Sequence, residues 1–116
     1  PMIRHVVADV LRDRYDVIEA NSADGAIAVL QATSPVDLVI SDVRMPGSID
    51  GFGLARWLSV HHPNTSVILM TGYYNDHQPP EGCRPPILQK PFNFERMLSL
   101  VAEMIERPTR PHSPPP

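Results

Sequence analysis

The chain has 116 residues, which is enough for one domain built around a single hydrophobic core. Its formal net charge is -3 and no basic cluster stands out, so the composition gives no support for nucleic acid binding. No apolar run approaches the roughly 20 residues that a membrane-spanning helix needs. A lone cysteine, Cys83, excludes an internal disulfide and suits a cytoplasmic protein.

The first half of the chain alternates between helical and strand patterns. Residues 2–13 carry an apolar stripe at helical spacing, which predicts a helix. Residues 15–20 alternate and are rich in β-forming residues, which predicts a strand. Ser22 can cap a second helix that ends before Pro35. Residues 36–41 form a continuous β-branched run, typical of a strand that is covered on both faces.

The second half repeats this alternation. Gly51 opens a helix that stops at the breaker "HHPN", and residues 66–71 predict a second buried strand. Residues 72–86 are rich in proline and turn formers, so any helix there is short or irregular. Residues 87–89 are a brief apolar run, and Asn93 can cap a closing amphipathic helix.

The chain therefore divides into a domain over residues 1–107 and a tail over residues 108–116. The tail, "PTRPHSPPP", lacks apolar periodicity and predicts a disordered or polyproline-like end. In the domain, strands that alternate with helices predict an α/β fold with a parallel sheet and helices on both faces.

Three polar residues fall at or just past the ends of predicted strands: Asp42, Thr71 and Lys90. Ligands of such sheets bind outside the carboxyl ends of the strands, so these side chains are expected at one rim. A carboxylate nucleophile, a hydroxyl donor and an ammonium are nearly all that phosphoryl transfer asks of a protein besides Mg²⁺. The residues alone leave a second interpretation open, in which Asp42 is a cap, Thr71 merely ends a strand and Lys90 is a solvated charge.

Three motifs, in this order, resemble the receiver domain of bacterial response regulators: "DLVISDVRMPGSIDG" (37–51), "VILMTGY" (67–73) and "LQKPF" (88–92). The resemblance covers residues 1–107. It implies a flavodoxin-like, doubly wound parallel sheet of strand order 2-1-3-4-5. It also implies two-component phosphorelay signalling, with a histidine kinase or a histidine phosphotransfer protein as the donor of a phosphoryl group.

The same resemblance implies a role for each rim residue. Asp42 matches the aspartate that becomes an aspartyl phosphate, Thr71 the switch hydroxyl, and Lys90 the counter-charge to the phosphoryl group. The Lys90–Pro91 bond is expected to be cis. Magnesium is the implied cofactor, with Asp42 as a ligand and Arg44 at the position whose backbone carbonyl completes the set.

The beginning of the chain departs from this family pattern. A receiver normally starts with an apolar strand that ends in two acidic residues, and "PMIRHVVADVLRD" resembles the family's sequence just after that pair. Without this central strand, its neighbours would lie about 10 Å apart, which is two strand spacings. Three outcomes are open: these residues are part of a larger molecule, the sheet closes up with four strands, or a second chain pairs in a homodimer. With Asp42 as the sole carboxylate, Mg²⁺ binding is expected to be weak or absent.

Ile87 is a smaller departure, because receivers usually place an aromatic residue three positions before the lysine. Together with the missing acids, it favours an alternative function: a phosphorylation-independent pseudo-receiver that acts as a protein-interaction domain. A third candidate is an enzyme such as an aspartate-nucleophile phosphatase. Those enzymes carry a second aspartate two positions on, where this chain has Arg44, so an enzyme is not expected.

Overall fold

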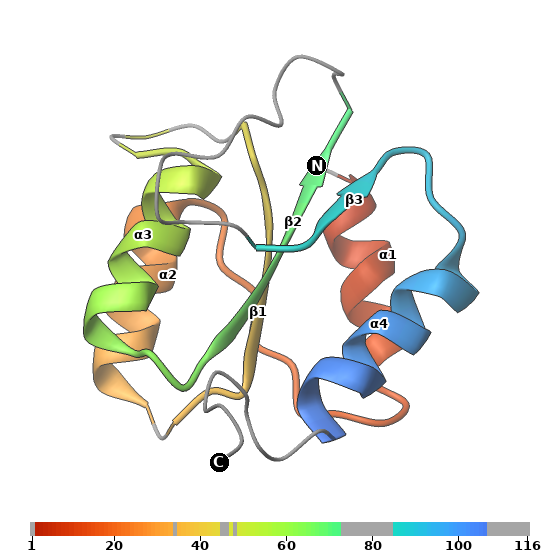
Figure 1. The fold of residues 1–116 in the computed structure, drawn as a ribbon, viewed down its shortest axis with the longest axis horizontal. Helices are drawn as coiled ribbons and strands as arrows, with labels where there is room; N and C mark the ends of the chain where they lie inside the picture. Colours follow the sequence, from red (N-terminus) through yellow and green to blue (C-terminus); the bar gives the residue numbers. More distant parts are fainter. Residues whose placement is uncertain (1, 34, 45–46, 48, 73–84, 107–116) are drawn as a thin grey trace, which may run out of the picture.

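A computed structural model describes residues 2–33, 35–44, 47, 49–72 and 85–106. The predicted tail, Cys83 and nearly all of the proline-rich segment 72–86 lie outside the described residues. Figure 1 shows a layered arrangement, in which a sheet lies between helices α2 and α3 on one side and α1 and α4 on the other. In chain order the elements are α1 (Met2–Leu11), α2 (Ala23–Ala32), β1 (Leu38–Asp42), α3 (Gly51–His61), β2 (Ser66–Thr71), β3 (Ile87–Gln89) and α4 (Phe94–Glu106).

The sheet of the described residues has three parallel strands in the order β1-β2-β3. β1 and β2 pair from Leu38 opposite Ser66 to Asp42 opposite Met70. β3 pairs with the second half of β2 and ends with Gln89 opposite Thr71. Parallel strands joined by helices confirm the predicted α/β class, and this order is the 3-4-5 part of the expected flavodoxin-like sheet. No helix of the described part of the chain is long and apolar enough to cross a bilayer.

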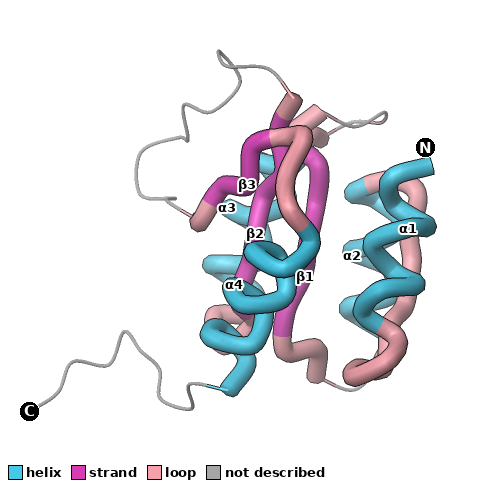
Figure 2. Tube along the Cα trace, turned by 90° about the vertical axis from the view of Figure 1, so that its right-hand side faces the viewer, coloured by secondary structure: helices cyan, strands magenta, loops and turns pink. Residues whose placement is uncertain are grey.

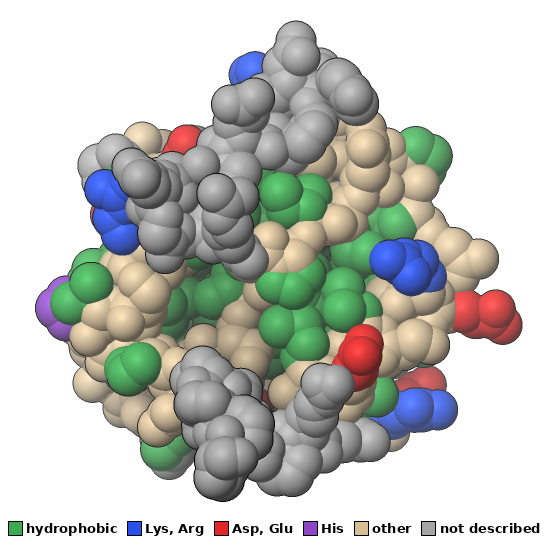
Figure 3. Space-filling model, viewed as in Figure 1, with side chains coloured by type: hydrophobic (Ala, Val, Ile, Leu, Met, Phe, Trp, Pro, Cys, Tyr) green, Lys and Arg blue, Asp and Glu red, His purple; other side chains and the backbone are tan. Residues whose placement is uncertain are grey.

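Each face of the sheet has its own cluster of buried side chains. Toward α1 and α4, Ile68 and Met70 of β2 pack with Met97 of α4. Val67, which points to the opposite face, packs against the cluster formed by α2 and α3. On the side shown in Figure 3, hydrophobic side chains gather toward the middle of the face. The two clusters fix the helices against the sheet, and with them the positions of the loops at its carboxyl edge.

Side-chain caps define where the helices begin. The Oγ of Ser22 and the Oδ1 of Asn93 each accept a hydrogen bond at 3.0 Å from the backbone N–H three residues later. The Oδ1 of Asp50 accepts the corresponding bond at the start of α3, at 2.9 Å. Such bonds satisfy amide groups that a helix leaves without a partner in its first turn. The predicted caps at Ser22 and Asn93 are therefore confirmed.

The strand predicted for residues 15–20 is wrong. These residues form no strand and pair with no strand of the described chain, although Figure 2 shows them on the side of β1 opposite to β2. A strand exists only through its ladder of backbone hydrogen bonds to a neighbour, and the alternating pattern cannot supply that neighbour. Val17 still packs against the core, whereas Ile18 is 59% exposed. The described sheet has therefore not closed up around this segment.

The strand predicted for residues 36–41 is found as β1, which begins two residues later and ends one residue later, and its burial is incomplete. Leu38, Val39 and Ile40 are only partly buried, whereas the last four residues of β2 are buried. The prediction of a strand covered on both faces thus holds for β2 and only in part for β1. Within the described residues β1 has a paired strand on one edge alone, and this accounts for the difference.

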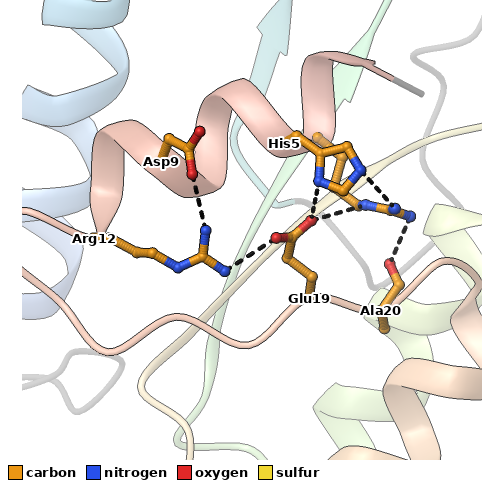
Figure 4. A network of polar contacts seen from close by, with 6 residues as sticks. His5, Asp9, Arg12, Glu19 and Ala20 are labelled. Atoms are coloured by element: carbon orange, nitrogen blue, oxygen red, sulfur yellow. Dashed lines mark hydrogen bonds and ion pairs between the residues drawn. The ribbon is translucent and has the colours of Figure 1, made fainter.

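Polar contacts attach the unpaired segment to α1, and Figure 4 shows Glu19 at their centre. Glu19 Oε1 lies 3.2 Å from Arg4 Nε and 2.9 Å from His5 Nδ1, and Glu19 Oε2 lies 3.0 Å from Arg12 Nη2. Arg12 also reaches Asp9, at 3.0 Å. The hydrogen bond from Arg12 is the main cause that lowers the pKa of Glu19 below its ordinary value.

Candidate functional site

Asp42 is the last residue of β1 and stands at the carboxyl edge of the sheet. Its register partner is Met70, and the ladder continues one residue further through a 2.9 Å bond from Val43 N to the Met70 carbonyl. The backbone on both sides of Asp42 is therefore fixed to β2. The Asp42 side chain is 22% exposed, so its carboxylate is largely shielded and still within reach of solvent.

Lys90 lies directly after β3 and reaches across to Asp42. The two strands lie on opposite sides of β2, yet Lys90 Nζ is 2.6 Å from Asp42 Oδ1. That oxygen is buried, and the ammonium gives it a partner of opposite charge that it would otherwise lack. The pair is mostly shielded, because only 30% of the Lys90 side chain is exposed. The Lys90–Pro91 peptide bond is cis, as the family resemblance implies.

Thr71 stands between these two residues, at the end of β2. It follows Met70, the register partner of Asp42, and its carbonyl accepts a 2.7 Å hydrogen bond from Lys90 N. Thr71 is 3% exposed. The structure thus brings Asp42 and Lys90 into contact and places Thr71 on the strand that separates them. All three lie at the edge where the sequence places them.

The donor set for a metal ion is small. Among the described residues no group of three or more His, Cys, Asp or Glu side chains could hold a metal. Of the two predicted ligands, Asp42 has one carboxylate to offer, and Arg44, an exposed residue two positions later, could offer only its backbone carbonyl. Magnesium is usually held by one or two carboxylates together with waters and phosphate oxygens. The residues fit Mg²⁺ only if waters and phosphoryl oxygens take most of its coordination positions.

Two residues for which no role in the site was predicted contact the Asp42 carbonyl. The Oγ of Ser41, a buried residue, donates a 2.8 Å hydrogen bond to the Asp42 carbonyl. Gly51, the first residue of α3, lies against the same carbonyl, and its N–H donates a 2.8 Å bond to the carbonyl of Val43. Two features of the sequence could have pointed to these residues: a serine inside an apolar run, and a glycine at the start of a helix, where glycine costs conformational entropy.

Comparison with known protein families assigns the chain to one of them. The model of the response regulator receiver domain matches residues 1–102. The chain belongs to this family. Receiver domains are the phosphoacceptor switch domains of two-component systems: they bind Mg²⁺ and interact with histidine kinases or phosphotransfer proteins.

Curated relatives are much longer than this chain. The sensor kinase CckA of Brucella abortus is 35% identical over 97 residues, which is 80% of this chain and 10% of the kinase. The nitrogen assimilation regulatory protein NtrX of Azorhizobium caulinodans is 30% identical over 111 residues, 91% of this chain and 24% of NtrX. The chain therefore spans a quarter or less of each of these two relatives.

Solved receiver structures share the fold. The response regulator TrrA of Thermotoga maritima, crystallised in complex with Mg²⁺-BeF, has a TM-score of 0.79 and 25% identity, with 90% of both chains covered. The receiver domain of NtrX from Brucella abortus has a TM-score of 0.77 and 26% identity, and covers 91% of this chain and 92% of that domain. These likenesses confirm the flavodoxin-like fold that the motifs imply.

Proposed function

We propose that Asp42 is the residue that accepts the phosphoryl group, from a histidine kinase or a histidine phosphotransfer protein. The observation that carries this proposal is the 2.6 Å contact between Lys90 Nζ and the buried Oδ1 of Asp42 at the carboxyl edge of the sheet. A cation beside a shielded carboxylate can stabilise the negative charge on the oxygens of a phosphoryl group that is transferred to that carboxylate. The domain serves as a switch for a partner and not as an enzyme.

In the transfer step a carboxylate oxygen of Asp42 forms a bond to phosphorus while the P–N bond of the donor phosphohistidine breaks. The electron pair of that bond stays with the imidazole, which leaves the reaction. Phosphoryl transfer requires mainly positioning and neutralisation of the peripheral oxygens. Lys90 can exchange its contact with the carboxylate for one with a phosphoryl oxygen, and the Thr71 hydroxyl can donate a hydrogen bond to another.

Magnesium would be held by the Asp42 carboxylate and the backbone carbonyl of Arg44, and would neutralise phosphoryl oxygens in the transition state. Because these residues provide a single carboxylate, we propose weak binding, with coordination completed largely by water and phosphate. Lys90 would then provide a large share of the positive charge that the transferred group meets.

The proposal is tested with acetyl phosphate and Mg²⁺, by following the intact mass of the protein. We expect a mass gain of one phosphoryl group, and no gain in Asp42→Asn, which keeps the size of the side chain and removes the nucleophile. Asp37→Asn is the matched control, because Asp37 precedes the opposite end of β1 and is exposed. Equal labelling of wild type and Asp42→Asn would remove Asp42 from its role.

We also propose that the edge of β1 that has no paired strand among the described residues pairs with a strand of a second copy, giving a homodimer. Val43 N points toward β2, so the N–H groups of Ile40 and Asp42 point to the other edge, since successive residues of a strand alternate. An unpaired apolar edge is a template for strand addition. Sedimentation should show a dimer whose Ile40 and Asp42 amides exchange slowly with solvent. A monomer in which these amides exchange quickly would contradict the pairing.

The remaining assignments are part of the same proposal. Residues 1–107 form the receiver domain and residues 108–116 a separate tail, and the domain works in the cytoplasm. Limited proteolysis tests the boundary: cleavage should occur first after residue 107 and leave phosphoryl uptake unchanged.

A further inference from the structure

We propose that Gly51 is a positioning residue for Asp42: the absent side chain at position 51 lets helix α3 rest directly on the Asp42 peptide and hold the carboxylate at Lys90. The inference rests on the proposed role of Asp42 and adds to it the element that sets its place. Gly51 makes this contribution through backbone contacts alone.

The space beside Gly51 is filled by backbone atoms. A Cβ at this position would overlap the carbonyl oxygen of Asp42 and would lie 2.9 Å from both the Asp42 carbonyl carbon and the Val43 Cα. A flexible side-chain end could rotate out of the way, but these atoms belong to a paired strand. Any residue other than glycine at position 51 must therefore displace either the strand or the helix.

The helix cannot withdraw without breaking other contacts. Gly51 N–H donates to the Val43 carbonyl at 2.8 Å, and the Asp50 side chain caps the first turn at Gly53 N. One and two turns further along, Leu54 and Leu58 are each 1% exposed in the cluster that α3 forms with α2. The buried leucines resist displacement, whereas the Asp42–Val43 peptide lies at the end of the β1–β2 ladder and is bonded to β2 through Val43 N–H. The Asp42–Val43 peptide is therefore the part that moves.

Lys90 would not follow such a movement. Its backbone is attached to β2 through the Thr71 carbonyl, on the other side of that strand from Asp42. A shift of the Asp42 backbone therefore changes the separation of Asp42 Oδ1 and Lys90 Nζ, which is 2.6 Å here. Reactions between such paired groups depend steeply on distance, and a misplacement of about 1 Å can reduce a rate about 100-fold.

Two other glycines serve as matched controls. Gly53 lies on the same turn of α3, and a Cβ there would lie 3.1 Å from the Ile49 Cβ, a side-chain atom on a loop. Gly72 borders the site itself, and among the described residues a Cβ there would meet only Lys90 Cδ, at 4.0 Å. Gly53→Ala tests the cost of alanine in the first turn, and Gly72→Ala tests an added methyl group beside Lys90.

The experiment measures the contact between Asp42 and Lys90 without using phosphorylation. A water-soluble carbodiimide takes up a proton and the Asp42 carboxylate to form an O-acylisourea. The Lys90 amine attacks its carbonyl carbon, an amide bond forms, and the C–O bond to the isourea breaks. The isourea leaves as a urea that carries one carboxyl oxygen and two hydrogens, so the protein loses the mass of one water. Peptide mapping locates the link. We expect the cross-link in wild type, Gly53→Ala and Gly72→Ala, and a yield at least about tenfold lower in Gly51→Ala.

Thermal unfolding of each variant shows whether the fold is retained. Should Gly51→Ala unfold, the reaction is repeated in trimethylamine N-oxide, which favours compact states. A wild-type yield in folded Gly51→Ala would overturn the proposal, and so would absence of the cross-link from wild type. Because the readout is independent of phosphoryl uptake, failure of acetyl phosphate labelling would remove the proposed function and leave the glycine effect standing.

Discussion

Strands β1 and β2 have similar sequences and different surroundings. Both are rich in aliphatic residues, "LVISD" in β1 and "SVILMT" in β2. β2 has a paired strand on each edge, and its last four residues are buried. β1 has a paired strand on one edge within the described chain, and its first three residues stay partly exposed. An apolar run thus predicts that a strand forms, while the number of neighbours decides how deeply it is buried.

The two edges of the sheet are also stabilised by different kinds of interaction. On the β2–β3 side, a regular ladder leads to Thr71 and Lys90 and fixes the rim. On the other side, segment 16–20 is attached by polar contacts around Glu19, two of which come from partly exposed arginines. Exposed ion pairs contribute at most about 1 kcal/mol each, much less than a buried aliphatic cluster. The site is therefore built mainly from the better-packed half of the molecule.

The largest effect on stability is expected from truncating the isoleucines that are register partners in β1 and β2. Ile40 and Ile68 are register partners, but Ile68 is fully buried and Ile40 is not. Ile68→Ala should lower the free energy of unfolding by about 2–5 kcal/mol, since it leaves a cavity. Ile40→Ala should cost about 1–2 kcal/mol, because less apolar surface is lost. Urea denaturation of the two variants measures the difference. Equal losses would mean that the edge of β1 without a paired strand in the described part of the chain is covered in solution.

A smaller effect is expected from the ion pair of the site. Single variants Asp42→Asn and Lys90→Met and the double variant form a cycle that isolates the coupling between the two charges. We expect about 1–2 kcal/mol, between the values for exposed and for fully buried pairs. The coupling should decrease only slightly in concentrated salt, because the pair is shielded from the ions that screen exposed charges. A coupling of zero would mean that the two groups are apart in solution.

The sequence predicts those elements whose signals are local. The caps at Ser22 and Asn93 and the bounds of β2 depend on a few adjacent residues, and the structure confirms them. The strand at 15–20 was wrongly predicted because its formation depends on a partner strand that no local pattern can supply. Asp42, Thr71 and Lys90 could be placed at one rim because parallel strands bring their carboxyl ends together. The close approach of Gly51 could not be predicted, because it depends on how α3 crosses the end of β1.

The caps of the helices on the two faces of the sheet should contribute equally to the free energy of unfolding. Asn93→Ala, at α4, and Ser22→Ala, at α2, each remove one hydrogen bond of 3.0 Å to a first-turn amide. Each is expected to lower the free energy of unfolding by about 1 kcal/mol. Thermal denaturation measures both, with Ser99→Ala on an exposed position of α4 as the control. If only Asn93→Ala has an effect, α2 contributes nothing to the cooperative unit, and the two faces of the sheet differ where equal contributions are expected.

The smallest effect on stability is expected from the Glu19 contacts, whose contribution depends on pH. The hydrogen bond from Arg12 lowers the pKa of Glu19 below its ordinary value of 4.5. A carboxyl group whose pKa is lowered by folding stabilises the native state above its unfolded pKa, and this contribution disappears as the pH falls through the folded pKa. The stability difference between wild type and Glu19→Gln should therefore be present at neutral pH and vanish in acid below 4.5. Asp9→Asn, which removes a more exposed partner of Arg12, should show a smaller change. A difference that grows toward low pH would contradict the assignment.

Chemical location of the phosphoryl group is the decisive test of Asp42 as the phosphoacceptor. The protein is labelled with acetyl phosphate and Mg²⁺ and then treated with borohydride, which reduces an aspartyl phosphate to homoserine. Peptide mass analysis should find homoserine at position 42, and none in a sample that received no acetyl phosphate. Homoserine at another aspartate, or a labelled protein in which Asp42 stays intact, would contradict the proposed role of Asp42.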